Sequence, residues 1–219
     1  MKSLELRSPK TLLAASFALV LALGIACNTG PKRVLSSASV KTFVEPSLQA
    51  GFVKSIAIFP LRNVRLQPDE LREINRGITD GFRRQNPKLN IVGASESITK
   101  LNDAGLADKY SEFLRNYSQS AIPEVKILQE IGKSLDVAAM LQGEVFSIAQ
   151  HDGNTFTFGR TSLTVRYVLL STSNGSVVWE ATGSAFKETE EVGKPAPTLF
   201  EVVQLAQDKI LGALPTLAQ

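Results

Sequence analysis

The stretch FTFGRTSLTVRYVLL, residues 156–170, alternates apolar and polar side chains and decides the fold class. In an extended chain its members fall on two faces, one apolar and one polar: Leu163, Val165, Tyr167 and Leu169 against Ser162, Thr164 and Arg166. Such alternation is typical of a strand with one face buried and the other open to solvent or to a partner. Residues 137–149 and 176–186 are also strand-like, and Asn174-Gly175 is a strong tight-turn signal. We therefore predict a C-terminal antiparallel meander of three strands.

A strand, a helix and a second strand are predicted upstream of the meander. Residues 53–61, VKSIAIFPL, are a short apolar run that indicates a buried central strand. A helix is predicted from Pro68-Asp69 to Asn86-Pro87, because apolar residues recur there at spacings of three and four: Leu71, Ile74, Ile78 and Phe82. Residues 89–93 form the second strand, so this order predicts a βαβ unit with a right-handed crossover.

Helical spacing predicts three more helices before the meander, over residues 95–102, 110–117 and 125–135. Ser95 is the expected N-cap of the first. A last helix begins at a capping box formed by Thr198 and Glu201, after a polar surface loop over residues 187–197. The predicted fold is α/β with an α+β tendency: a central mixed sheet, begun by the βαβ unit, ended by the meander and flanked by helices in one domain over residues 51–219.

The N-terminus has the layout of an export signal. Basic residues at Lys2, Arg7 and Lys10 precede residues 11–26, an uncharged run of 16 residues that ends on small side chains before Cys27. The run is shorter than the roughly 20 apolar residues of a membrane-spanning helix, although an uncleaved anchor is an alternative. We predict a signal peptide over residues 1–26, cleaved between Ala26 and Cys27.

Cys27 is the single cysteine of the chain, so an intramolecular disulfide is excluded. A cysteine directly after the small residues of a signal resembles the lipobox of bacterial lipoproteins, which implies that Cys27 carries the lipid and becomes the first mature residue. The match is imperfect upstream, since Gly24 stands where that family usually has leucine. Ordinary signal cleavage would cut the same bond and leave no lipid, and an incidental free thiol is a further alternative.

Residues 27–50 are predicted to be a lipidated start and a tether that leads into a strand or arm, and about 20 extended residues span roughly 65 to 70 Å. Asn28 is not the aspartate that retains lipoproteins at the inner membrane of enteric bacteria, which favours the periplasmic face of the outer membrane. The formal charge is +3, and about +2 leaves with the signal. The mature protein is therefore nearly neutral and lacks the clustered basic residues of a nucleic-acid-binding protein.

No motif in the sequence indicates catalysis. There is no phosphate-binding glycine loop and no Gly-x-Ser-x-Gly elbow, and His151, the single histidine, is expected in a turn without a second histidine or cysteine. We predict no enzyme activity, no cofactor and no metal. Arg166, on the polar face of the meander, and Trp179, expected to be half-buried on the sheet surface, are the candidates for an interaction surface.

The order of elements and the segments KSIAIFPL, SLDVAAMLQGEV and VRYVLLSTSNGSVVWEATG resemble a broad group of bacterial envelope lipoproteins. The group includes the curli secretion channel subunit, the lipoprotein activator of a peptidoglycan synthase and the N-terminal domain of the periplasmic Tol protein. The resemblance implies a lipid-anchored, non-catalytic adaptor or assembly factor with an envelope protein partner. A self-assembling, homo-oligomeric secretion subunit is the alternative, although long membrane-inserted hairpins are not apparent, and a small envelope hydrolase using His151 is the third hypothesis.

Overall fold

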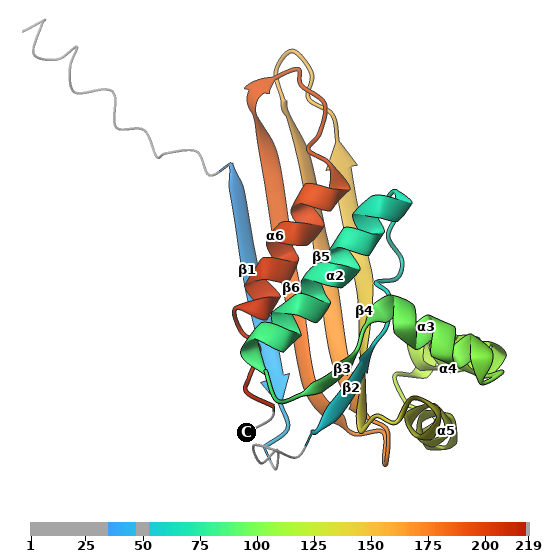
Figure 1. Cartoon of the computed structure of the whole chain (residues 1–219). Coiled ribbons are helices and arrows are strands. Elements are labelled where there is room, and N and C mark those ends of the chain that lie inside the picture. The colour runs from blue at the N-terminus through green and yellow to red at the C-terminus, as the bar shows by residue number, and fades with distance from the viewer. Residues whose placement is uncertain (1–34, 47–52, 218–219) are drawn as a thin grey trace, which may run out of the picture. The chain divides into compact units, whose positions relative to one another are not determined.

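The computed structural model describes residues 35–46 and 53–217, which belong to one compact unit, Leu35–Gln219. Its strands form one mixed sheet in the order β1-β6-β5-β4-β2-β3 (Figure 1). The strands are β1 (Ser36–Val44), β2 (Ser55–Ile58), β3 (Asn90–Val92), β4 (Ala139–His151), β5 (Phe158–Ser171) and β6 (Val177–Val192). The helices are α2 (Pro68–Gln85), α3 (Ala94–Asp103), α4 (Ala107–Ser120), α5 (Val125–Leu135) and α6 (Leu199–Leu211). None of these helices is both long and apolar enough to span a bilayer.

The predicted βαβ unit is confirmed. Strand β2 pairs in parallel with β3, and α2 connects them. The helix has the predicted limits because Pro68 occupies its first turn, where no backbone donor is needed, and Asn86 is its C-cap. Its apolar residues Ile74, Ile78 and Phe82 are buried as the spacing predicted. On its other edge β2 pairs in parallel with β4, which joins the βαβ unit to the meander.

The predicted meander is also confirmed, because β4 pairs antiparallel with β5 and β5 with β6. Its strands are longer than expected. Residues 187–192 were expected in a loop, but they continue β6, where Lys187 pairs with Thr161 and Val192 with Phe158. The expectation that His151 lies in a turn is likewise wrong, since it is the last residue of β4 and pairs with Arg160. Polar residues can extend these strands because most side chains at that end of the sheet are exposed or half-buried.

Strand β1 corrects the expected domain boundary. All nine of its residues pair antiparallel with β6, from Ser36 opposite Lys187 to Val44 opposite Trp179. The compact unit therefore begins at Leu35 and not at residue 51. Only seven residues separate Cys27 from Leu35 in the sequence, so a chain from one Cα to the other spans at most about 29 Å, not 65 to 70 Å.

Two hydrophobic cores hold helices against the two faces of the sheet. Helices α2 and α6 cover one face (Figure 1), where Ile78 and Ile210 are buried with Val165 and Trp179. Helices α3, α4 and α5 cover part of the other face around Met140. One helix start differs from the prediction: Gly93 is the N-cap of α3, and Ser95 lies within the helix.

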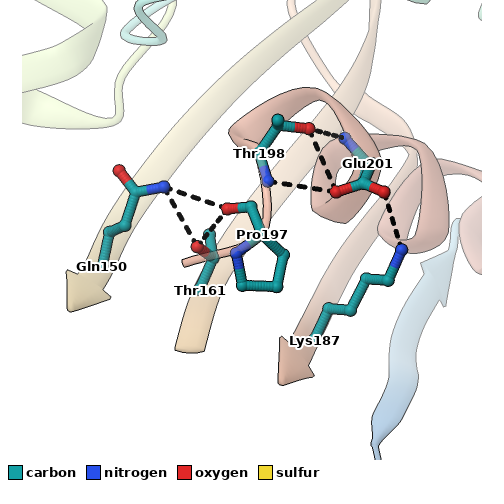
Figure 2. Close-up of polar contacts among 6 residues, drawn as sticks. All are labelled: Gln150, Thr161, Lys187, Pro197, Thr198 and Glu201. Carbon is teal, nitrogen blue, oxygen red and sulfur yellow. Dashed lines mark hydrogen bonds and ion pairs between the residues drawn. The ribbon is translucent and has the colours of Figure 1, made fainter. Parts of the chain in front are cut away.

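The start of α6 forms the predicted capping box (Figure 2). The Thr198 hydroxyl accepts a hydrogen bond from the Glu201 amide, and the Glu201 carboxylate accepts one from the Thr198 amide. The Pro197 carbonyl accepts hydrogen bonds from the side chains of Thr161 and Gln150. A hydrogen bond from Lys187 is the main cause that lowers the pKa of Glu201. These contacts fix α6 and the loop before it to the end of the meander.

Candidate docking site

One part of the sheet carries exposed and half-buried polar side chains where β1, β6, β5 and β4 extend beyond α3, α4 and α5. The register places these side chains in two rows across the four strands. We call these rows the open face: Ser39, Ser184, Thr164 and Ser147 in the first row, and Ser37, Phe186, Ser162 and Ala149 in the second. A shallow hollow of about 380 Å³ lies over them. Short hydroxyl side chains therefore form most of this surface, and Phe186 is the one ring in the two rows.

Charged side chains border the open face as paired groups. The Arg160 guanidinium donates to Glu188 at 2.9 Å and lies 4.2 Å from the centre of the Phe186 ring. Arg166 donates to Glu180 at 2.7 Å. Because each arginine faces a carboxylate on β6, these charged groups do not produce a strong field of one sign at this surface.

The structure places Arg166 at the edge of the open face, as its position in the alternating pattern predicted. Burial acts to lower the pKa of Arg166, but the hydrogen bond and charge of Glu180 outweigh burial and raise it, so the guanidinium stays charged. It lies 5.8 Å from the ring centre of Phe146. Mainly because of burial, the neighbouring Tyr117 has a raised pKa, so its hydroxyl remains neutral at physiological pH.

Phe146 is a surface residue that the sequence prediction missed. The pairing of β4 with β5 shifts by one residue between Val145 and Ser147, and this β-bulge leaves Phe146 unpaired and 57% exposed. The signal in the sequence is the adjacent apolar pair Val145-Phe146, which interrupts the alternation. A bulge re-aims a side chain, and here it adds a ring beside Arg166.

The expectation that Trp179 is half-buried on the sheet surface is wrong. Its side chain is 0% exposed, and its ring meets Phe82 of α2 edge to face at a centroid distance of 5.8 Å. The physical reason is that Trp179 faces α2 and α6, while β1 extends the sheet beyond β6 and closes that side of the core. Trp179 is therefore a core residue and not part of an interaction surface.

Three further residues named in the sequence analysis are Ala26, Cys27 and His151. Ala26 and Cys27 lie outside the described residues. His151 is exposed at the end of β4, next to Arg160 in the register. Within residues 35–46 and 53–217, no group of three or more His, Cys, Asp or Glu side chains could hold a metal ion.

The described residues thus define a mixed α/β domain with a polar open sheet face. Comparison with known proteins adds structural likenesses only, because no protein-family model and no curated protein sequence matches this chain. A PelC dodecamer subunit from Paraburkholderia phytofirmans is 18% identical, with a TM-score of 0.47 over 84% of this chain and 99% of that one. Lipoprotein GNA1162 from Neisseria meningitidis is 9% identical, with a TM-score of 0.43 over 73% and 96%.

The C-terminal domain of LpoB from Salmonella enterica is 15% identical, with a TM-score of 0.38 over 64% of this chain and 85% of that one. One of these structural neighbours is named a lipoprotein. Likenesses this distant carry no conclusion about what the present chain binds.

Proposed function

We propose that this chain is a lipid-anchored protein of the bacterial cell envelope that acts as a non-catalytic adaptor or assembly factor. Cys27 carries the lipid, the outer membrane holds it, and the domain faces the periplasm. The observation that carries the proposal is the open face, a surface formed by four paired strands and bordered by aromatic and arginine side chains. The rings of Phe186 and Phe146, with the guanidinium groups of Arg160 and Arg166 beside them, suit a protein partner, since aromatic and arginine side chains are enriched at protein interfaces.

The anchoring half of the proposal predicts that Cys27→Ser releases the protein from membranes. Without the thiol no diacylglyceryl group can be attached, so the protein should move from the membrane to the soluble periplasmic fraction. Fractionation of cells followed by immunoblotting measures the shift, and Thr29→Ser is the control that should stay with the membrane. An unchanged thermal unfolding curve shows that the released protein is folded. Membrane retention of a folded Cys27→Ser protein would contradict the anchor.

The docking half predicts contacts with a foreign envelope protein at the open face. A photoreactive amino acid at Ser184 should crosslink one or two such proteins in cells, identified by mass spectrometry. The same group at Lys88, an exposed residue after α2, is the control and should give no adduct. The absence of crosslinks to another protein from position 184 would refute docking through the open face.

A second candidate function, self-assembly as a secretion-type subunit, is favoured by the outer edge of β1. In the described sheet β1 is an end strand that pairs only with β6, and an edge of nine residues can accept another strand. A photoreactive amino acid at Thr42, an exposed residue of β1, distinguishes the two candidates. Adducts made only of this chain, obtained at Thr42, would support self-assembly over the adaptor.

A further inference from the structure

The turn between β4 and β5 presents an aromatic ring to solvent. Phe156 is 89% exposed, more than any other large hydrophobic residue of the described chain, and Val192, which pairs with Phe158 just after the turn, is 42% exposed. Isolated exposed apolar residues are ordinary on protein surfaces. This one lies at the end of the meander's long strands, which is the most projecting part of the sheet in Figure 1.

Hydrogen bonds hold the turn that carries Phe156 in one conformation. The Asn154 carboxamide oxygen accepts hydrogen bonds from the amides of Phe156 at 2.9 Å and Thr157 at 3.0 Å. The backbone of Asn154 and Thr157 pairs in both directions at 3.1 Å. The neighbouring loop is bound as well, since Gly153 donates to the Lys194 carbonyl. The ring is therefore displayed by an ordered turn, and contact with another surface would cost little conformational entropy.

The N-terminal end of β1 lies at the same end of the sheet as this turn (Figure 1). The Leu35 carbonyl accepts a hydrogen bond from the Glu188 amide, and Ser36 is opposite Lys187. Val192, next to the turn, is five residues beyond Lys187 along β6, a distance of about 17 Å at the rise of a β-strand. The segment from Cys27 to Leu35 spans at most about 29 Å. A bilayer that holds a lipid on Cys27 is therefore within reach of the Phe156 turn.

We propose that Phe156 and Val192 contact the surface of the bilayer that anchors Cys27. Two attachments, the lipid and the turn, then hold the strands at a steep angle to the membrane and keep the open face accessible from the periplasm. The inference rests on the lipidation of Cys27 and adds to it a second contact with the same membrane. Phe is among the apolar side chains that bury in the headgroup boundary, because part of the ring then leaves water.

The charged side chains near the turn do not favour an electrostatic contact with anionic lipid, so the proposed membrane contact depends on the apolar side chains. Lys194 pairs with Glu191 at 3.2 Å, and Asp152 places a carboxylate in the turn itself. A bilayer with anionic headgroups would repel this turn. We therefore expect the contact in vesicles of zwitterionic phospholipid, and a weaker contact when anionic lipid is added.

Single-cysteine labelling of the full lipidated chain tests the proposal. Lipid on the Cys27 sulfur leaves no free thiol, so Phe156→Cys provides a unique one. Ile122→Cys is the matched control, because Ile122 is an apolar residue, 71% exposed, next to Pro123, which packs against Gly175 in the turn at the opposite end of the sheet. Each variant is labelled with the same fluorophore and reconstituted into zwitterionic vesicles that contain nitroxide-labelled lipid. The label at position 156 should be quenched and shifted to the blue, and the label at 122 should not.

In a second pair of variants the fluorophore is at position 155, so the effect of the Phe156 side chain is measured without replacing it by the label. A fluorophore at Thr155→Cys should be quenched when Phe156 is present, and Phe156→Ser should reduce its membrane-bound population about tenfold, as expected for removal of one buried apolar side chain. Equal quenching at positions 156 and 122, or no quenching at either, overturns the proposal. Failure of the lipid anchor is a separate result, because the intact mass would then lack the diacylglyceryl group.

Discussion

Replacing Trp179 by alanine should lower the free energy of unfolding by about 3–5 kcal/mol. The ring is fully buried between α2, α6 and the sheet, and it lies edge to face against Phe82. Truncation removes its burial and leaves a cavity that the neighbouring strands cannot close, because Leu169 and Val44 are fixed opposite it by the register. Urea denaturation followed by circular dichroism measures the loss.

Phe43→Ala is the control for this experiment. Phe43 is also a large aromatic residue near the same edge of the sheet, but it is 46% exposed. Because much of the ring already contacts water, its removal should cost about 1 kcal/mol or less. Equal losses for Trp179→Ala and Phe43→Ala would show that Trp179 is not the core residue described above.

The βαβ unit and the meander could be predicted because their signals are local. Pro68 and Asn86-Pro87 limit α2, and the apolar residues between them share one face. The Asn174-Gly175 signal marks the turn between β5 and β6, where Gly175 has a φ of +73° that favours glycine. Each of these features depends on neighbours within one or two turns of chain.

Features that depend on distant segments were missed. A strand or arm was expected at the end of residues 27–50, but its pairing with β6, more than 130 residues later in the sequence, and its place inside the domain were not. Its pairing also decides the environment of Trp179. Along β5 the polar face is open at Thr164 and Arg166 but covered at Val168, because α3, α4 and α5 extend over only part of it. Alternation separates the two faces and does not tell how far a helix layer reaches.

The candidate site was predictable in part for the same reason. The alternation placed Arg166 on the polar face of the strand with Ser162 and Thr164, and the register of β5 with β6 agrees with that placement. The rows of the open face could not be found, since they bring together Ser39, Ser147, Thr164 and Ser184 from four strands. Their alignment requires the register of all three pairings, and the bulge at Phe146 changes that register by one residue.

Asn86 was correctly predicted to end α2, and its side chain also contacts a segment that is distant in the sequence. It ends α2 as expected, and its side chain is fully buried. Its carboxamide oxygen accepts a hydrogen bond from the amide of Leu217, and its nitrogen donates to the Pro215 carbonyl at 3.4 Å. The C-terminal segment after α6 is thereby fixed over the end of α2, and the Leu217 side chain is 0% exposed.

Asn86→Ala should therefore destabilise the protein by about 2–3 kcal/mol, because the buried Leu217 amide loses its acceptor and a small cavity forms. Urea denaturation measures the loss, and hydrogen exchange should show faster exchange of the Leu217 amide than of core amides in β5. Gln85→Ala is the control: the Gln85 side chain donates a hydrogen bond to the Leu211 carbonyl at the end of α6, but Gln85 is exposed, so its replacement should cost at most about 1 kcal/mol. If Asn86→Ala matched Gln85→Ala in stability and left Leu217 protected, the C-terminal segment would be held by its apolar contacts alone.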